Sequence, residues 1–440
     1  MAKETEVFEK EQCKVNRCEL IGSDGNRIDL GENLLEVQVN QSIDAPFMTG
    51  YLLYNDSQDI PAIISLNGNE LISLSFSQPG LEAIAFERTF RVYRLENRTP
   101  VGSSSSFFVL HFCSQEGVTN LTTRVNKAYS ERFIAEIVGD ILETYLNAKP
   151  REDLIEPTVG LYNVVIPDWR PIEAINWCCS RAYDLDNFAY HFYETRDGWN
   201  FKSLQSMYND TPPEYNKLPY TYSVKAVDKS LPATSIEGQR KLENDAYSFE
   251  QFKIVQDFDV FHSVGSGAFS TTLLAIDLRN QTFVRNAYNV NEARGRLLND
   301  FPPINDENMI NSSESNFSTY VSTEDGPSEL GNQINKWFLP SRLHKNLIES
   351  VVIDATLPGN VLMKPGTSIF VDLPEMNSAN EKGKKFNPML SGKYLIRDVV
   401  QILRKTDDST FKIFTNLTLC SDSFAEELPT GKNISLNILR

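Results

Sequence analysis

The sequence SVVIDATLPGN at 350–360 begins a stretch of four runs rich in Val, Ile, Thr and Phe. The other three runs are LMKPGTSIFVDLP at 362–374, SGKYLIRDVVQIL at 391–403 and TFKIFTNLTL at 410–419. Apolar and polar residues alternate in much of the stretch, which is typical of antiparallel strands buried on one face. Pro-Gly and Asp-Asp-Ser turns separate the runs. Four strands with no helical segment between them predict a small closed or strongly curled barrel.

Residues 13–118 are also predicted to be all β. Ser23, Asp24 and Gly25 lie between two short apolar runs, which is a strong hairpin signal. Further short, regular strands follow and predict a second barrel or a sandwich. The two β regions share no obvious sequence repeat, and we expect them to superimpose as one fold. The expected cores are centred on Leu52, Leu71, Leu74 and Val92 in the first region, and on Val352, Ile369, Leu395 and Leu417 in the second.

Residues 119–215 have a different pattern, which predicts a compact α/β module. Ser130 is expected to cap a helix through Leu146, because apolar residues recur there at three- and four-residue steps. A second helix is expected to begin at Pro171, a residue suited to the first helical turn. A hairpin is expected around Asp197 and Gly198.

The remaining segments complete the predicted organisation. The second β region is assigned to 216–420, with a strand from about 248 and another through 269–277. A polar insertion at about 286–344 is expected to end in a short helix around 333–338. Residues 1–12 are expected to form a charged arm, and residues 421–440 a tail without a partner strand. The predicted fold class is mainly β with a smaller α/β part, two antiparallel barrels flanking the module.

Six residues in strands and turns are expected to matter for structure. Glycine is favoured where strands turn or approach closely, since it has no Cβ. The positions are Gly50, Pro358, Gly359, Gly366, Gly392 and Tyr394. Gly366 and Gly392 are expected to matter more than any acidic residue.

Composition limits the function classes. The chain of 440 residues carries a formal net charge of −17, which argues against a broad basic surface for nucleic acid. The sequence contains no run of 18 or more apolar residues, so no membrane span is expected. Its charged start lacks an apolar signal core, so no secretory signal is expected. The six cysteines lack metal-binding or disulfide spacing, so free thiols in a reducing compartment are expected.

A search for chemistry finds no catalytic, cofactor-binding or metal-ligating set. The four histidines, His111, His191, His262 and His344, are scattered. We expect His111 and His191 to be satisfied strand residues rather than metal ligands. Two acidic pairs, Asp184 with Asp186 and Asp257 with Asp259, have the residue types of glycosidase carboxylates. Solvated turn or strand positions are the favoured interpretation of both pairs.

Several quoted pieces occur in the order of a known family. LPGN, MKPGTSIFVDLP and SGKYLIRDVVQIL resemble the second tube-like barrel of baseplate central hub proteins from large contractile-tailed bacteriophages of the T-even kind. TGYLLYNDS at 49–57 and the strands after it are similar to the first barrel of that family. PDWRPIEAINWCCSRAY at 167–183 and YHFYETRDGWNFKSL at 190–204 resemble the small domain between the barrels. Related barrels occur in the hub part of type VI secretion spikes.

The resemblance implies a structural rather than enzymatic role in the virion, after assembly in the host cytoplasm. A homotrimer would place six barrels around a channel, between the sixfold tail tube and the threefold central spike, with other baseplate proteins around it. Genome DNA would pass without specific binding, and a negatively charged lining would repel phosphates. No cofactor and no membrane binding are implied. The alternatives are a β-rich polysaccharide-degrading tail enzyme and a carbohydrate-binding protein.

Overall fold

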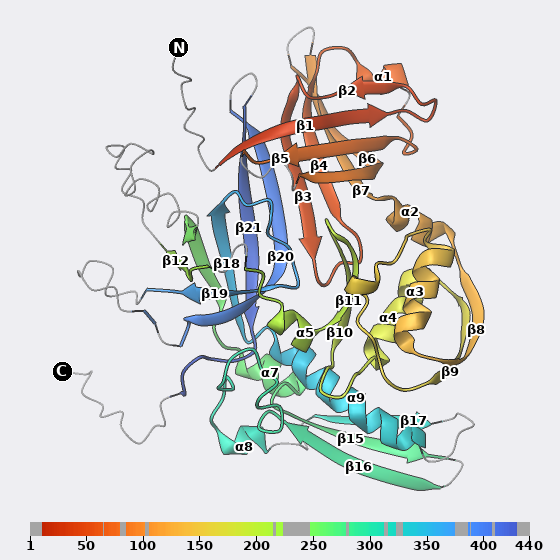
Figure 1. The fold of residues 1–440 in the computed structure, drawn as a ribbon, viewed down its shortest axis with the longest axis vertical. Helices are drawn as coiled ribbons and strands as arrows, with labels where there is room; N and C mark the ends of the chain where they lie inside the picture. The colour runs from red at the N-terminus through yellow and green to blue at the C-terminus, as the bar shows by residue number, and fades with distance from the viewer. Residues whose placement is uncertain are drawn as a thin grey trace, which may run out of the picture.

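Strands dominate the fold, and most of them join one large mixed sheet (Figure 1). The computed structural model describes residues 11–64, 66–79, 85–101, 105–213, 217–222, 247–278, 281–311, 316–322, 329–374, 386–387, 389–406 and 410–428. The prediction of a mainly β chain with a smaller helical part is confirmed.

The first β region contributes seven strands to this sheet. They are β1 (Gln12–Ile21), β2 (Arg27–Asp29), β3 (Leu34–Ser42), β4 (Thr49–Asp56), β5 (Leu71–Ser77), β6 (Phe86–Val101) and β7 (Ser105–Ser114), with α1 (Ile60–Ile64) between β4 and β5. Their order is β3-β4-β7-β6-β5-β1, every pair is antiparallel, and β2 pairs with β1. The predicted hairpin is confirmed, because Leu20 pairs with Ile28 across a turn in which Gly25 has φ +83°.

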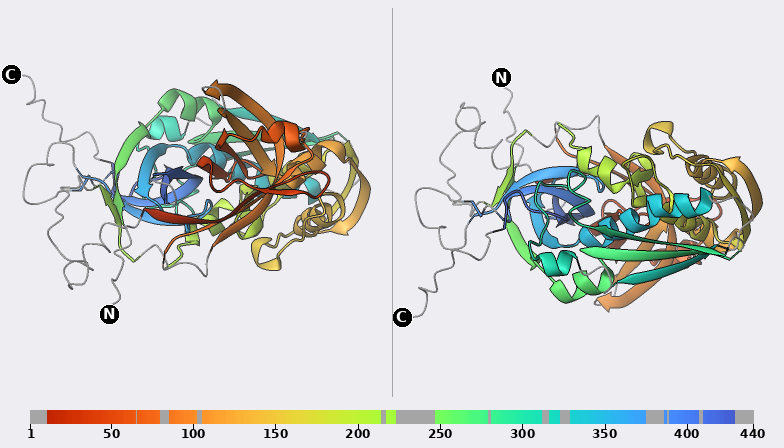
Figure 2. Two further views of the ribbon diagram at one scale, coloured as in Figure 1. Left: turned by 90° about the horizontal axis from the view of Figure 1, so that it is seen from above. Right: turned by 90° about the horizontal axis from the view of Figure 1, so that it is seen from below.

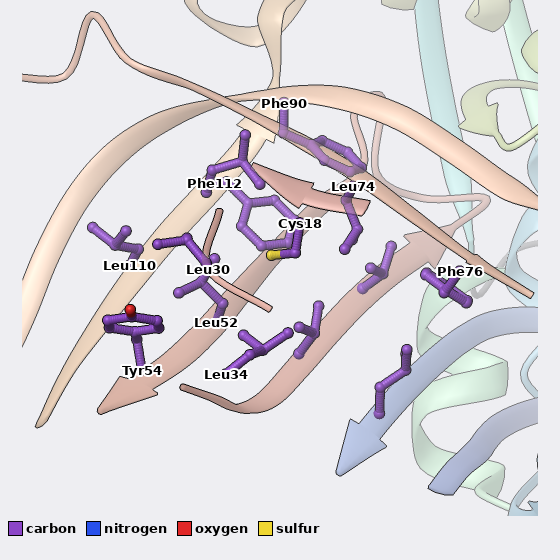
Figure 3. Packing of buried hydrophobic residues seen from close by; sticks show 14 of the residues in the cluster. Cys18, Leu30, Leu34, Leu52, Tyr54, Leu74, Phe76, Phe90, Leu110 and Phe112 are labelled. Atoms are coloured by element: carbon purple, nitrogen blue, oxygen red, sulfur yellow. The ribbon is translucent and has the colours of Figure 1, made fainter. Parts of the chain in front are cut away.

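Alternation along these strands builds the first core. On β4 every second residue is buried, so Leu52 and Tyr54 point to the side where Leu110 and Phe112 of β7 lie (Figure 3). Phe76 stacks on Phe86 with ring centroids 4.7 Å apart. Burial of this much apolar surface is the main force that holds the strands in register.

The middle module follows β7 directly. It consists of α2 (Gln115–Thr122), β8 (Val125–Arg132), α3 (Ile134–Tyr145), η2 (Glu152–Leu154), β9 (Tyr162–Trp169), α4 (Pro171–Arg181), β10 (Tyr190–Thr195), β11 (Gly198–Ser203) and α5 (Leu204–Asn209). The helix starting at Pro171 is confirmed. The predicted β10–β11 hairpin is also present, with Thr195 paired to Gly198 across the turn.

The predicted start of the first module helix is wrong. Ser130 lies in β8, which pairs with β9, and α3 begins only at Ile134. Glu136 accepts a hydrogen bond from the backbone N–H of Phe133 at 3.4 Å and so caps the helix. Ser130 instead donates to Asn163 Oδ1 of β9 at 2.9 Å. Pairing with a strand distant in sequence therefore overrides the local capping signal.

The second β region completes the large sheet. Its strands are β12 (Tyr220–Tyr222), β13 (Ser248–Phe249), β14 (Gln251–Gln256), β18 (Val351–Pro358), β19 (Ser368–Asp372), β20 (Gly392–Lys405) and β21 (Phe411–Ser421). The order is β12-β19-β20-β21-β18-β14. All pairs from β19 to β14 are antiparallel, whereas β12 runs parallel to both β13 and β19.

A separate substructure lies between β14 and β18. It contains α7 (Val260–Ser266), β15 (Ser270–Asp277), β16 (Thr282–Asn289), α8 (Glu307–Ile310), β17 (Phe317–Ser322) and α9 (Glu329–Leu347). The assignment of 269–277 to the second barrel is wrong, because β15 forms a three-stranded sheet with β16 and β17. Figure 2 shows α9 lying along this small sheet. The predicted short helix is wrong in length, since α9 continues through Pro340, and Leu343 and Leu347 are buried.

The two β regions have the same strand order. In the first it is β3-β4-β7-β6-β5, and in the second it is β14-β18-β21-β20-β19. When the five strands of each region are numbered in chain order, both orders read 1-2-5-4-3. Each pair is antiparallel in both. The fourth strand in chain order is the longest of the five in each region, with 16 residues in β6 and 14 in β20. The substructure with α9 occupies the place of the short β3–β4 connection in the first region.

The residue registers also correspond. The row of paired residues in the first region is Val39, Gly50, Phe112 and Val92. The row in the second region is Ile254, Ile353, Leu419 and Ile396. A β-bulge follows at once in both long strands, between Val92 and Arg94 and between Ile396 and Asp398. Bulges disrupt a ladder at a defined place, so their shared position supports the equivalence of the two regions.

One hairpin belongs to both regions. The part of β20 beyond its bulge pairs with β3, and the start of β21 pairs with β1 (Figure 1). Because β20 and β21 also pair with each other, the path of hydrogen-bonded strands through the first region returns to its start. Leu403, Phe411 and Ile413 at the tip enter the first core, whereas Ile396 and Leu419 at the base enter the second.

Some core and tail predictions need correction. Leu52, Leu74 and Val92 lie in the first core as predicted, and Ile369 and Leu417 lie in the second. Leu71 is only half-buried, and Val352 and Leu395 face the opposite side of the sheet. That side is apolar too because α5 and β10 of the module cover it with Tyr193 and Met207.

The two ends were predicted to be an arm and an unpaired tail. Most of the arm, 1–10, and the tail from 429 lie outside the described residues. Gln12 already pairs with Lys412 within the sheet. The start of the predicted tail does have a partner, because Phe424 and Phe301 form a two-way backbone bridge with N–O distances of 2.7 and 3.0 Å.

Candidate functional site: an assembly surface

A continuous antiparallel sheet crosses both β regions in the order β14-β18-β21-β20-β3-β4-β7-β6. One face of it carries mostly polar side chains, because alternate residues point away from the two cores. A single row across this face consists of Gln251, Thr356, Asn416, Val400, Asn40, Thr49 and Cys113. Neighbours in the row bond to each other, as Thr356 Oγ1 donates to Asn416 Oδ1 at 3.0 Å.

Charges of both signs occur on this polar face. Arg404 of β20 pairs with Glu36 of β3 at 2.7 Å, and His111 Nε2 lies 2.7 Å from Glu96 Oε1. Lys253 lies opposite Asp354 in the β14–β18 ladder. Hydroxyl, amide and paired charged groups therefore predominate on this face. Groups of this kind satisfy one another and leave little net charge to bind an anion.

The three predicted glycines of the second region lie where other parts of the chain approach. A Cβ at Gly359 would collide with Ile413, and one at Gly392 would lie 3.0 Å from Asn299 Oδ1. Gly366 has φ +76°, and a Cβ there would collide with the hydroxyl of Tyr193 in the module. The three glycines thus lie at three different contacts of the second region. Gly359 lies against the tip of the hairpin, Gly392 against the inserted substructure and Gly366 against the module.

The other three predicted positions also lie at close contacts. Gly50 faces Phe112, and a Cβ on it would come within 2.6 Å of that ring. Pro358 ends β18 opposite Phe414. Tyr394 is buried on β20, donates its hydroxyl to the carbonyl of Leu390 at 2.8 Å, and has its pKa raised by burial. These contacts are structural and bring no reactive groups together.

Sequence reasoning missed Glu194, a buried carboxyl on β10 that joins the module to the first region. The backbone N–H of Met48 donates to Glu194 Oε2 at 3.0 Å, and the hydroxyl of Ser114 donates to the same oxygen. Burial is the main cause that raises the pKa of Glu194 to about 7. β10 reads YHFYET and is buried on both faces, so no alternation in the local pattern distinguishes this carboxyl from an exposed one.

The candidate catalytic carboxylates hold local structure instead. Asp184 forms a backbone bridge with Asn187, Asp186 pairs with Arg296, and Asp259 accepts from the backbone N–H of His262 at 2.9 Å as the cap of α7. A groove of about 380 Å³ over β14, β18 and β21 contains one carboxylate, Asp354. Glycoside hydrolysis uses two carboxyl groups on either side of the scissile bond.

The histidines are separated in the fold as well. His111 lies on the polar sheet face and His262 in α7, whereas His344 is buried in α9 and stacks on Phe188 with centroids 6.4 Å apart. His191 Nδ1 lies 3.5 Å from Asp44. Within the described ranges, no group of three or more His, Cys, Asp or Glu could hold a metal ion. No helix in the described part of the chain has the length and hydropathy that a membrane crossing needs.

Comparisons with known proteins identify the fold. The sequence matches no protein-family model and no curated protein. The structure is similar to that of the tail protein from Neisseria meningitidis MC58, with a TM-score of 0.53, 13% identity, and 92% of this chain and 96% of that chain covered. This chain has the fold of a phage tail protein.

A second comparison agrees. The 43 kDa tail protein of prophage MuSo2 from Shewanella oneidensis aligns with a TM-score of 0.54 and 8% identity, over 93% of this chain and 99% of that one. The similarity in fold thus extends over nearly the whole length of both tail proteins. The resemblance to phage tail proteins is confirmed at the level of the fold.

Proposed function

We propose that this chain is a structural baseplate hub of a contractile phage tail. In this proposal 13–118 forms one tube-like barrel and 119–215 is the module between the barrels. The other barrel is formed by 216–420 without the inserted substructure from α7 to α9. Three chains would then present six near-equivalent β units around one axis. The observation that carries the proposal is the repeated strand order of β3–β7 and β14–β21, with its equivalent bulges at Val92 and Ile396.

The duplication would solve a problem of symmetry. A trimer with a pseudo-sixfold face can dock on a sixfold tail tube, while its own threefold symmetry suits a central spike. Further baseplate proteins would surround the ring. The shared β20–β21 hairpin supports this role, because it fixes the relative position of two β units within one chain.

The polar sheet face would line the channel through which the genome passes. Hydroxyl and amide groups such as Asn40, Thr49 and Asn416 offer weak, replaceable contacts. The nearly balanced charges would neither hold a polyanion nor strongly repel it. The chain would therefore act in the virion by shape and assembly, with no catalytic step.

The oligomeric mass tests this proposal. We expect the purified protein to form a trimer of about 150 kDa from three chains of 49.9 kDa, or to form a larger complex that contains three copies when its central spike protein is present. Size-exclusion chromatography with light scattering measures this mass directly. A chain that remains monomeric both alone and with the spike would remove the hub function.

A further inference from the structure

The contact between the two β regions provides a template for contacts between copies. Beyond its bulge, β20 pairs residue by residue with β3, from Asp398 opposite Ser42 to Arg404 opposite Glu36. Val37 and Val39 of β3 are completely buried in the core that Leu403 enters from the hairpin. The hairpin of one β unit thus covers the first strand of the other unit and closes its core.

The first region has the equivalent hairpin, β6–β7, and its outer part is uncovered. The ladder with β5 ends at Arg91, and among the described strands the rest of β6 pairs only with β7. Leu95 of β6 is equivalent to Val399 of β20, since these residues pair with Leu110 and Leu417. Val399 is completely buried, whereas Leu95 is 37% exposed and its neighbour Tyr93 is 51% exposed.

The second region has the equivalent first strand, β14, and its outer edge is open as well. In the described part of the chain β14 lies at the end of the strand path and pairs only with β18. Phe252 and Ile254 correspond to Val37 and Val39 but are only half-buried. Just beyond, Phe258 is 74% exposed. An uncovered edge beside exposed apolar side chains is a site where another strand can pair.

We propose that the β6–β7 hairpin of one copy pairs with β14 of the next copy, in the way that β20–β21 pairs with β3 within a chain. The partner surface is therefore a second copy of this chain, and three copies close a ring. This inference rests on the proposed trimeric hub and specifies its interface. Within the chain, the hairpin of the second region pairs with the first strand of the first region. Between copies, the hairpin of the first region would pair in the same way with β14, the first strand of the second region.

The equivalent registers define which residues meet. Thr99 corresponds to Ile402, because their partners, Phe107 and Phe414, lie at the same distance from the reference row. A second bulge between Glu96 and Thr99 makes β6 one residue longer than β20 over this stretch. Lys253 corresponds to Gln38, the partner of Ile402. Thr99 of one copy should therefore lie opposite Lys253 of the next. Near the other end, Arg94, which pairs with Glu96 on its own strand, would lie near Asp257 of the next copy, where opposite charges favour this docking.

Engineered disulfides test the pairing. Thr99→Cys and Lys253→Cys replace exposed residues in the full-length chain, and directly opposed strand residues lie within the Cα separation that a disulfide needs. We expect mild oxidation to produce covalent dimers and trimers on non-reducing gels. The two single variants control for native thiols. A Thr99→Cys, Phe283→Cys variant is the matched negative control, because Phe283 is exposed on β16, in the separate small sheet.

A positive control fixes the interpretation. Ile402→Cys with Gln38→Cys should form an intrachain disulfide, seen as a mobility shift without added mass. A trimer by light scattering that forms no interchain disulfide, while this control does, would overturn the edge pairing and leave the hub function intact. A chain that stays monomeric at high concentration and forms no interchain product would also overturn the pairing. The test with the spike protein then decides the hub function separately.

Discussion

Val92 of β6 and Ile396 of β20 occupy the same position in two copies of one strand pattern. The backbone N–H of Val92 donates to the carbonyl of Glu70 at 3.0 Å, and that of Ile396 donates to the carbonyl of Thr367 at 2.9 Å. In both strands a bulge follows. Beyond it, each hairpin extends outside its own β unit. This correspondence is the structural basis for regarding one chain as two related building blocks.

Replacement of Gly366 by alanine should weaken the contact between the second region and the module. The residue has φ +76°, and its Cβ would collide with the Tyr193 hydroxyl. Both effects act in the folded state, so we expect Gly366→Ala to lower the free energy of unfolding by about 2 kcal/mol or more. Urea titration followed by circular dichroism measures the change.

Gly139→Ala is the matched control. Gly139 lies inside α3, and a Cβ there would meet no atom within 4 Å. Because alanine favours helices, this variant should be more stable by up to about 1 kcal/mol. Equal changes in unfolding free energy for the two variants would contradict the close contact between Gly366 and Tyr193.

The Glu194 carboxyl should make stability depend on pH. Its pKa is raised from 4.5 to about 7 by burial, so the folded chain holds this proton more tightly than the unfolded chain. Its stabilising contribution is fully present below pH 4.5 and is lost as the pH rises through 7. Glu194→Gln keeps an oxygen acceptor for Met48 and Ser114 but does not titrate.

The measurement compares wild type and Glu194→Gln between pH 4.5 and 7. The difference in unfolding free energy should change by up to about 3 kcal/mol across this window, in favour of the variant at the higher pH. Other titrating groups, such as Asp422, are present in both proteins and cancel in the difference. Parallel pH profiles would mean that Glu194 is hydrated in solution.

The six cysteines should differ in reactivity. All six are free thiols, and Cys113 is half-buried whereas the other five are buried. Burial raises the pKa of Cys113 to about 11 and that of Cys18 to about 12, so few thiolates are present at pH 8. We expect a disulfide reagent to label at most one thiol slowly in the native protein and six after unfolding. Rapid native labelling of two or more would contradict the packing.

The sequence predicts structure where local pattern and final environment agree. The strands from Val351 to Leu419 are recognisable because alternation and turn residues coincide there. Pro340 is a local stop signal, yet α9 passes through it because Leu343 and Leu347 gain burial beyond it. Burial against distant elements thus outweighs the local cost of a proline in the helix interior.

The contacts between the two β regions and the module could not be predicted from sequence alone. Arg404 and Glu36 form an ion pair although they are 368 positions apart. Glu194 and Met48 are likewise 146 positions apart, and neither residue has a local signature of this contact. The predicted glycines at 359, 366 and 392 signalled close approach but could not reveal what approaches them.

Images of the assembled protein viewed along its axis test the central claim most directly. Rotational analysis of cryo-electron microscopy averages should give a threefold ring with a strong sixfold component, because each chain supplies two equivalent β units. The outer part of β6 should meet β14 of the neighbouring copy in the reconstruction. A ring with three β units and no sixfold component, or a different subunit number, would contradict the account.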